Sequence, residues 1–377
     1  MNYRSMFSKV ARMVFAAVIC FQVSAMAQSQ PTLAIGDKAP ELRYGKWLKG
    51  TPIKEYEKGR LYLFEFWATW CGPCIASMPH LSEFARERKH EATVIAVDIW
   101  EKTGDKPYES AWPKVARFVQ QMGDKMDFNV ITDTKDQFMG NSWMKAAGQE
   151  GIPCTIMVKD GIILWMGHPI ELDSIVNVVL SGKYNMEASK KDREEKDRIN
   201  DSLAAPFKMI YTRYDAMVKE QQYQEAVSLM DSAIANSKPE YAGTYGFFKF
   251  QVMLEHLNED AAMEYVRKWQ ASKPGYTGSV AGVICSKTGL KKTTYEYGIG
   301  LLKEMLSNPQ MPPPVAYKLI ATGYANMGDF KSAVETLEKS IKTTKTLLKE
   351  GKYAGFVTED SLKEQEEQLA GYRKSLK

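Results

Sequence analysis

Two cysteines, separated by two residues, lie where an expected strand meets an expected helix. Leu61–Trp67 is apolar except for one acid, which is the pattern of a buried strand, and we expect Cys74–Lys89 to be helical. Cys71 then lies where the helix presents unpaired N–H groups and the positive end of its dipole, with Pro73 in the first turn. Both features favour a thiolate, the nucleophilic form of cysteine. We therefore predict that Cys71 attacks, and that Cys74, one turn deeper, resolves the mixed disulfide.

Other uses of this cysteine pair fit the sequence less well. A zinc site needs four ligands, and there is no second Cys-x-x-Cys and no nearby histidine pair. Haem attachment needs a histidine directly after the second cysteine, where Ile75 stands. A structural disulfide that closes so short a loop would stabilise the chain little, and a peroxidatic Pro-x-x-x-Thr-x-x-Cys motif is missing. Redox exchange without a cofactor or metal is the favoured interpretation.

The strand and helix pattern changes part-way along the chain. Strands alternate with helices and are followed by a hairpin and a final helix, which predicts a three-layer α/β domain. A highly charged stretch, 190–201, follows, and we interpret it as a linker or as the start of a solvated helix. Segment 275–289 is rich in Gly, Ser and Thr and is expected to be irregular. Besides Leu61–Trp67, the expected strands are Thr93–Asp98, Thr155–Val158 and Ile162–Met166, and the further helices of this part are Trp112–Met122 and Leu172–Leu180.

Helical periodicity dominates the second half. Tyr223 with Ala226, Met230 and Ala233 is echoed by a similar series from Phe330, which resembles the tetratricopeptide repeat and predicts a repeat-like, all-α region. A protein partner can be expected there. The expected helices are Phe207–Val218, Tyr223–Ile234, Glu259–Trp269, Val315–Met327 and Phe330–Leu347.

The segment Phe66-Trp67-Ala68-Thr69-Trp70-Cys71-Gly72-Pro73-Cys74 resembles the active-site signature of thioredoxin and of its exported TlpA/ResA-type relatives. The resemblance extends over roughly 33–182 and implies the thioredoxin-like fold, a central mixed sheet flanked by helices. Pro79 matches the helix-kinking proline of the family, and Glu65 matches its buried carboxylate. Gly151-Ile152-Pro153 matches the cis-proline loop, and Ile99–Gln149 matches the extra strand–helix element of the exported branch.

The resemblance also implies roles around the cysteines. Glu65, in apolar surroundings, should have a raised pKa and relay the proton that Cys74 loses, although a buried acid satisfied by backbone donors is the alternative. A cis Pro153 would leave the backbone of Ile152 free to pair with an extended substrate peptide. Trp70 is expected to form an apolar rim, with packing as its alternative. Gly72 and Pro73 complete the expected substrate contacts, and this dipeptide is the one found in reducing thioredoxins.

The remaining thiols and imidazoles carry no clear chemistry. Cys154 directly follows Pro153, and we interpret it as a small buried strand residue rather than as a third, regulatory thiol. Cys285 has no assigned role. No metal or triad spacing relates the histidines, which we expect at the surface or at caps: His80, His90, His168 and His256.

The first residues are expected to direct export. Arg4, Lys9 and Arg12 precede the apolar run 13–23, and Ala25-Met26-Ala27 supplies the small residues of a cleavage site. We therefore expect a periplasmic protein, with an uncleaved inner-membrane anchor as the alternative. The formal net charge is +4 and falls to +1 without these three basic residues, which gives no reason to expect nucleic acid. The expected divisions are a signal peptide at 1–27, a thioredoxin-like domain at 28–185, a charged linker at 186–202 and a helical domain at 203–377.

Two functions follow. The first is an exported thiol–disulfide oxidoreductase that acts on protein disulfides or thiols, as a reductant, with electrons from another redox protein. The second is a non-catalytic scaffold whose helical region recruits a partner.

Overall fold

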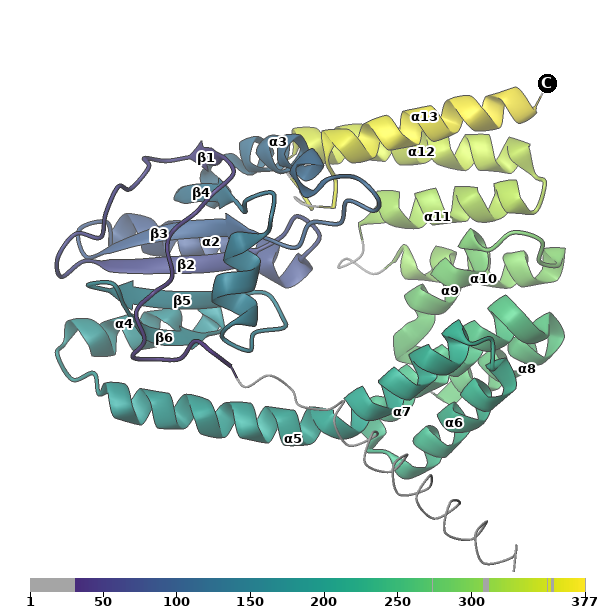
Figure 1. Cartoon of the computed structure of the whole chain (residues 1–377). Helices are drawn as coiled ribbons and strands as arrows, with labels where there is room; N and C mark the ends of the chain where they lie inside the picture. The colour runs from purple at the N-terminus through teal and green to yellow at the C-terminus, as the bar shows by residue number, and fades with distance from the viewer. Residues whose placement is uncertain (1–30, 273, 308–311, 351, 354–355, 377) are drawn as a thin grey trace, which may run out of the picture.

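The computed structural model describes residues 31–272, 274–307, 312–350, 352–353 and 356–376. A sheet with helices on both faces forms one part of the molecule, and a curved row of helices forms the other (Figure 1). The long helix α5 (Met186–Lys219) leads away from the sheet. The last helix, α13 (Glu359–Ser375), returns to the first part, where it meets α3 (Trp112–Met122) (Figure 1).

The sheet of the described residues has six strands in the order β1-β4-β3-β2-β5-β6. β2, β3 and β4 run parallel, whereas β1, β5 and β6 are antiparallel to the strands they pair with. The fully buried β2 therefore lies inside the sheet, with a partner on each side. The strands are β1 (Trp47–Lys49), β2 (Leu61–Trp67), β3 (Ala92–Asp98), β4 (Asn129–Thr132), β5 (Cys154–Lys159) and β6 (Ile162–Gly167).

The two faces of the sheet form two cores. Successive side chains of a strand point to opposite faces, so β2 contributes to both. One core packs against α2 (Gly72–Glu87), α3 and α4 (Leu172–Leu180), and the other against the π-helical turn η3 (Gly140–Lys145). Glu65 has the parity of the first set and lies on the face that packs against α2. β2 supplies Leu61, Leu63 and Trp67 to the first core, and Tyr62, Phe64 and Phe66 to the second.

The second part consists of helices that pack on their neighbours in the chain. Contacts join α6 to α7, α9 to α10, α10 to α11, α11 to α12 and α12 to α13. This confirms the predicted helical region, while the tetratricopeptide-like character stays a prediction. After α5 come α6 (Tyr223–Asn236), α7 (Pro239–Val252), η5 (Met253–Leu257), α8 (Glu259–Ser272), α9 (Thr277–Ser286), α10 (Lys292–Met305), α11 (Pro313–Asn326), α12 (Phe330–Lys349) and α13.

The prediction of an irregular segment at 275–289 is wrong, because Thr277–Ser286 forms the helix α9. Val280, Ala281 and Ile284 are buried at helical spacing. The segment has few large apolar residues because its neighbours approach closely. A Cβ on Gly323 of α11 would lie only 3.0 Å from the Sγ of Cys285. Small residues that favour turns in isolation here permit helix packing.

The charged segment 186–202 is not an irregular linker but the first half of α5. Of the two interpretations offered for 190–201, a linker or the start of a solvated helix, the structure confirms the helix. Asn185 caps it by accepting a hydrogen bond from the N–H of Ala188 at 2.9 Å. Arg193 donates to the carbonyl of Met166 in β6 at 2.9 Å, which ties this charged helix to the edge of the sheet.

The predicted signal peptide, 1–27, lies outside the described residues. Within the described ranges, we find no helix with the length and apolar character required to cross a membrane.

The packing of η3 against β2 gives a first prediction. Trp143 is fully buried, its ring centroid is 4.6 Å from that of Phe64, and its Nε1 donates to the carbonyl of Glu41 at 3.2 Å. Trp143→Ala should lower the free energy of unfolding by about 3–5 kcal/mol, since it leaves a large cavity. Urea unfolding followed by circular dichroism measures this. Ile170→Ala, at a side chain that is 80% exposed, is the control and should change stability by less than about 0.5 kcal/mol.

Candidate active site

The turn from β2 into α2 places the two cysteines. Cys71 is the N-cap residue of α2, with extended backbone (φ −86°, ψ 94°), and its Sγ accepts a hydrogen bond from the N–H of Cys74 at 3.2 Å. Pro73 lies in the first helical turn, where no N–H is needed. Pro79 is inside the same helix. The backbone donor and the helix dipole both favour negative charge on the sulfur of Cys71.

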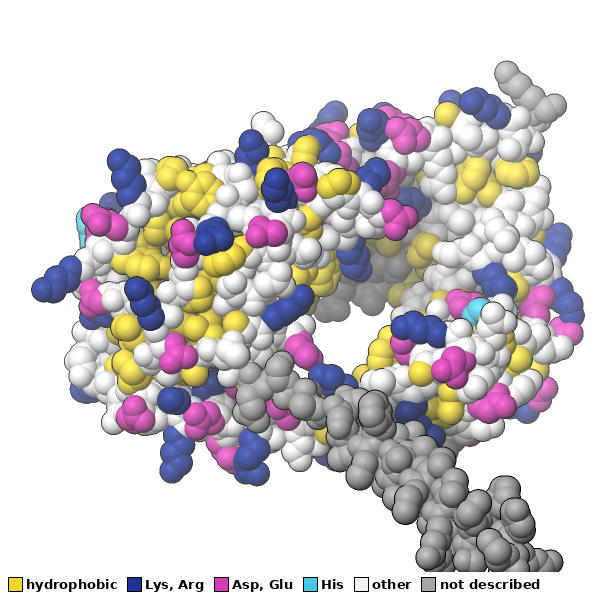
Figure 2. Space-filling view, in the orientation of Figure 1, with side chains coloured by type: hydrophobic (Ala, Val, Ile, Leu, Met, Phe, Trp, Pro, Cys, Tyr) yellow, Lys and Arg dark blue, Asp and Glu magenta, His cyan; other side chains and the backbone are white. Residues whose placement is uncertain are grey.

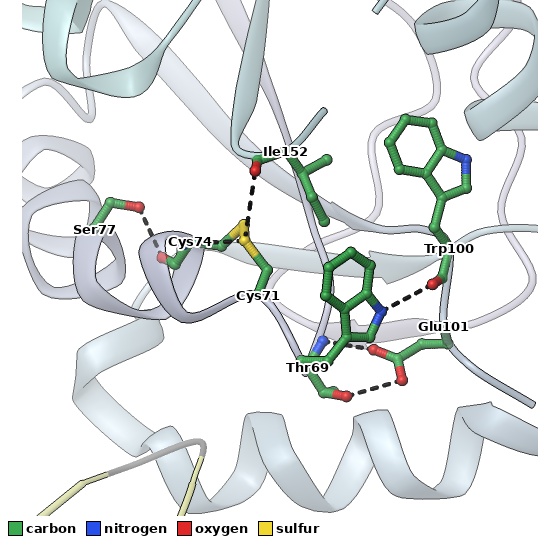
Figure 3. The surroundings of a disulfide bond; sticks show 8 residues. Thr69, Cys71, Cys74, Ser77, Trp100, Glu101 and Ile152 are labelled. Carbon is green, nitrogen blue, oxygen red and sulfur yellow. Dashed lines mark hydrogen bonds between the residues drawn. A yellow bond between two sulfur atoms is a disulfide. The ribbon is translucent and has the colours of Figure 1, made fainter. Parts of the chain in front are cut away.

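Cys71 and Cys74 form a disulfide with their Cα atoms 5.3 Å apart (Figure 3). Cys71 is 3% exposed and Cys74 is fully buried, so the first cysteine is the one a partner can reach. Gly72 and Pro73 between them are more exposed than either cysteine. The pair thus has the spacing and the unequal access that disulfide exchange requires.

The loop before β5 faces the disulfide. The Ile152–Pro153 peptide bond is cis, as the resemblance implies. The carbonyl oxygen of Ile152 points at Cys71 and lies 3.7 Å from its Sγ (Figure 3). Among the described residues, neither the N–H nor the carbonyl of Ile152 has a backbone hydrogen-bond partner.

Glu65 is a buried carboxyl on the α2 side of the sheet. It is fully inaccessible and pairs across the sheet with Thr155, whose hydroxyl donates a short hydrogen bond to Oε2. Its other oxygen, Oε1, has no partner within the described structure. Burial raises the pKa of Glu65 to about 8, although the Thr155 hydrogen bond acts in the opposite direction. The alternative of a carboxylate satisfied by backbone donors therefore fits less well than a neutral carboxyl near its titration point.

A second carboxyl, which was not among the predicted site residues, supports the turn. Glu101 accepts from the N–H of Thr69 at 2.5 Å and from its hydroxyl at 2.8 Å (Figure 3). It also pairs with Lys114 at 3.2 Å. Trp100, with φ at 56°, accepts from Nε1 of Trp70 at 2.9 Å (Figure 3). The residues before Cys71 are thus held by the loop that follows β3. In the sequence, Glu101 is recognisable only as an acid three residues after a buried strand, and no local pattern links it to Thr69.

A further buried acid borders this loop. Asp98, the last residue of β3, is fully buried, and neither of its oxygens has a hydrogen-bond partner among the described residues. Burial, with the nearby Glu101 and Asp133, raises its pKa well above the usual range. Burial and the two neighbouring acids therefore both disfavour the charged form of Asp98.

The other two thiols are buried, and the thiolate form of each is disfavoured. Cys154 is 3% exposed in β5, and burial raises its pKa to about 12, which supports a packing role rather than a regulatory one. Cys285 is fully buried in α9, and burial likewise raises its pKa to about 12. His168 caps a helical turn by accepting from the N–H of Ile170, and His80 pairs with Asp173 at the surface. No cluster of ligands for a metal ion occurs among the described residues.

Comparisons with known proteins agree with this geometry. Residues 34–177 match the family model named Redoxin. Two thiol-disulfide oxidoreductases named ResA are similar: that of Oceanobacillus iheyensis is 28% identical over 97 residues, and that of Geobacillus thermodenitrificans 27% identical over 135. The chain carries a thioredoxin-like domain. Within this domain, the chain is similar to thiol-disulfide oxidoreductases.

The extent of these similarities differs. The two ResA matches cover 24% and 34% of this chain, and 50% and 66% of those proteins. Protein FixW of Rhizobium leguminosarum is 24% identical over 211 residues, which is 54% of this chain and 91% of FixW. The solved thioredoxin domain of a thiol-disulfide oxidoreductase from Bacteroides vulgatus is 24% identical, covers 41% of this chain and 99% of that one, and has a TM-score of 0.31.

The raised pKa of Glu65 makes stability depend on pH. The folded chain holds this proton up to about pH 8, whereas the unfolded chain releases it near 4.5, so the wild type loses stability as pH rises between these values. The stability of Glu65→Gln relative to the wild type should therefore rise by about 3–5 kcal/mol across that window. Urea unfolding of the oxidised proteins at several pH values measures the difference. Glu83→Gln, at an exposed acid on α2, should show no such rise, and a flat Glu65→Gln profile would contradict the assignment.

Proposed function

We propose that this chain is an exported reductant of protein disulfides that works through Cys71 and Cys74. The observation that carries the proposal is the sulfur of Cys71 at the N-cap of α2, where the N–H of Cys74 donates to it and the carbonyl of Ile152 lies beside it. The same donor that contacts the disulfide sulfur would stabilise the thiolate of the reduced form. The ResA names of similar proteins support the reaction class.

The reaction proceeds in two exchanges. The thiolate of Cys71 attacks one sulfur of the substrate disulfide, forms a mixed disulfide and releases the other substrate sulfur as a thiolate, which takes up a proton from solvent. Cys74 then loses its proton and attacks the Sγ of Cys71. The second substrate thiol leaves, and the Cys71–Cys74 disulfide forms. Two electrons pass to the substrate, and a separate redox protein must return them.

Glu65 is proposed to accept the proton of Cys74. It lies on the α2 side of the sheet, its Oε1 is unpartnered in the described structure, and a pKa of about 8 lets it change charge near physiological pH. The Thr155 hydroxyl holds the other oxygen and so fixes the orientation of the carboxyl.

Substrate contacts are proposed for the surface around Cys71. Ile152 offers backbone N–H and carbonyl groups to an extended peptide, and Pro153 holds this loop opposite the cysteines. Trp70 is 42% exposed and held by its indole N–H, so it presents an apolar rim, with Gly72 and Pro73 beside it.

The proposal also includes the direction of the redox reaction, the cellular compartment and the domain limits. The Gly72-Pro73 dipeptide favours reduction, and the basic-apolar-small order at 1–27 favours a periplasmic location. The domain limits that fit best are 28–185 for the thioredoxin-like domain and 203–377 for the helical region, with α5 spanning the boundary.

Trapping tests the order of attack. In Cys74→Ala, the mixed disulfide on Cys71 cannot be resolved, so protein adducts that dithiothreitol releases should accumulate in the exporting host. The double variant Cys71→Ser/Cys74→Ala should trap none, and Cys285→Ser should behave as the wild type. Adducts that persist in the double variant would contradict the role of Cys71. Gel shifts without reductant, followed by mass spectrometry, provide the measurement.

A pH profile tests the proton transfer. Release of thionitrobenzoate from a mixed disulfide on Cys71 should accelerate as pH rises through about 8, because the carboxylate fraction of Glu65 grows. Glu65→Gln should slow this release about 100-fold at pH 8, which is the lower end of the usual size of a general-base effect. Glu83→Gln is the control. Equal rates for Glu65→Gln and the wild type would show that Cys74 loses its proton elsewhere.

A further inference from the structure

The helical region returns to the redox site at its far end. Arg117 of α3 donates to both carboxylate oxygens of Asp360 in the first turn of α13, from Nε at 3.1 Å and from Nη2 at 2.8 Å. Thr358 caps α13 in a reciprocal arrangement with Ser361, and Val357 is 4% exposed. The short segment before α13 is therefore fixed at both its own helix and the thioredoxin-like domain.

This segment places an aromatic ring beside the cysteines. A Cβ built on Gly72 would lie 3.4 Å from the Cζ of Phe356, so the ring is in contact range of the residue between Cys71 and Pro73. Phe356 is nevertheless 51% exposed. A half-exposed phenylalanine gains only part of the free energy that burial of its ring would give. Its position is set by the anchored neighbours, and its free apolar surface is available to a ligand.

Helix α5, which leads into the helical region, also forms a wall of the site. Lys208 of α5 pairs with Glu150, two residues before Ile152, at 3.1 Å. A groove of about 550 Å³ runs from Pro73 past the Ile152–Pro153 loop to α5. Its α5 wall includes Asp192, Arg193 and Lys196, so it is polar and carries both charges. Figure 2 shows a hollow between the two parts of the molecule.

We infer that the helical region completes the substrate site and that Phe356 determines specificity, by contacting an apolar residue next to the substrate cysteine. This inference rests on the proposed function. The substrate it fits is an extended polypeptide segment with a disulfide, since the groove continues along the free backbone of Ile152 and away from the sulfur. We expect a small disulfide to react at Cys71 without contacting Phe356 or α5.

Phe356→Ala in the full-length chain tests the contact. The second-order rate constant for oxidation of the prereduced protein is measured with insulin and with bis(2-hydroxyethyl) disulfide. Phe356→Ala should slow the reaction with insulin about five- to tenfold, the common effect of removing one aromatic anchor. Phe356→Ala should react with the small disulfide at the wild-type rate. The conservative variant Phe356→Tyr should keep most of the wild-type rate with insulin.

Variants at the Arg117–Asp360 ion pair test whether this contact holds Phe356 in place. Arg117→Asp places two like charges together and should reproduce the selective loss, while Arg117→Asp/Asp360→Arg should recover the insulin rate. Val315→Ala, at a side chain of the helical region that is 37% exposed, is the matched control and should change neither rate.

The outcomes separate this inference from the proposed function. An equal loss with both substrates, an unchanged insulin rate or a faster one in Phe356→Ala would each overturn the specificity role. An Arg117→Asp variant with the wild-type insulin rate would overturn the role of the Arg117–Asp360 ion pair in positioning Phe356. A wild-type chain that reacts with neither substrate would instead refute the proposed function.

Discussion

The sulfur of Cys71 receives a backbone N–H because β2 ends where α2 begins, and this junction must be rigid for the donor to stay aligned. β2 is held by β3 on one side and β5 on the other, and all seven of its residues are buried. The four residues between strand and helix are held in turn by Glu101 at Thr69 and by Trp100 at Trp70. The electrostatic environment of the Cys71 sulfur is therefore built from groups that cannot relax without disturbing the sheet.

The same interior carries carboxyls that oppose stability. Glu65 and Asp98 are fully buried, and burial raises the pKa of each. Neutral carboxyls avoid the larger cost of a buried charge, but an unpartnered oxygen still loses its hydration. Apolar side chains at positions 65 and 98 would be buried at a lower cost in folding free energy. The proposed proton transfer accounts for the acid at position 65, whereas that at position 98 borders the loop that holds the turn before Cys71.

Local pattern determined how much could be predicted. Leu61–Trp67, Trp112–Met122 and Leu172–Leu180 occur as expected because their periodicity and end signals are local. The cysteine pair was predictable because its chemistry depends on one strand-to-helix junction. The link between Glu101 and Thr69 spans 32 residues, and that between Arg117 and Asp360 spans 243, so neither leaves a trace in neighbouring sequence. The helix α9 was missed because its small residues serve tertiary packing.

Contacts far from the disulfide can therefore bear on it. The row of helices is tied to the thioredoxin-like domain at its start, through Arg193 on β6, and at its end, through Asp360 on α3. Between these ties its curvature depends on close helix approaches: a Cβ on Gly246 would meet Trp269 at 2.5 Å. Enlarging such a position must displace the Trp269 ring or move one helix relative to the next. Because the far end holds the segment before α13, a shift inside the row would reach the ring beside Gly72 without altering any residue of the redox pair.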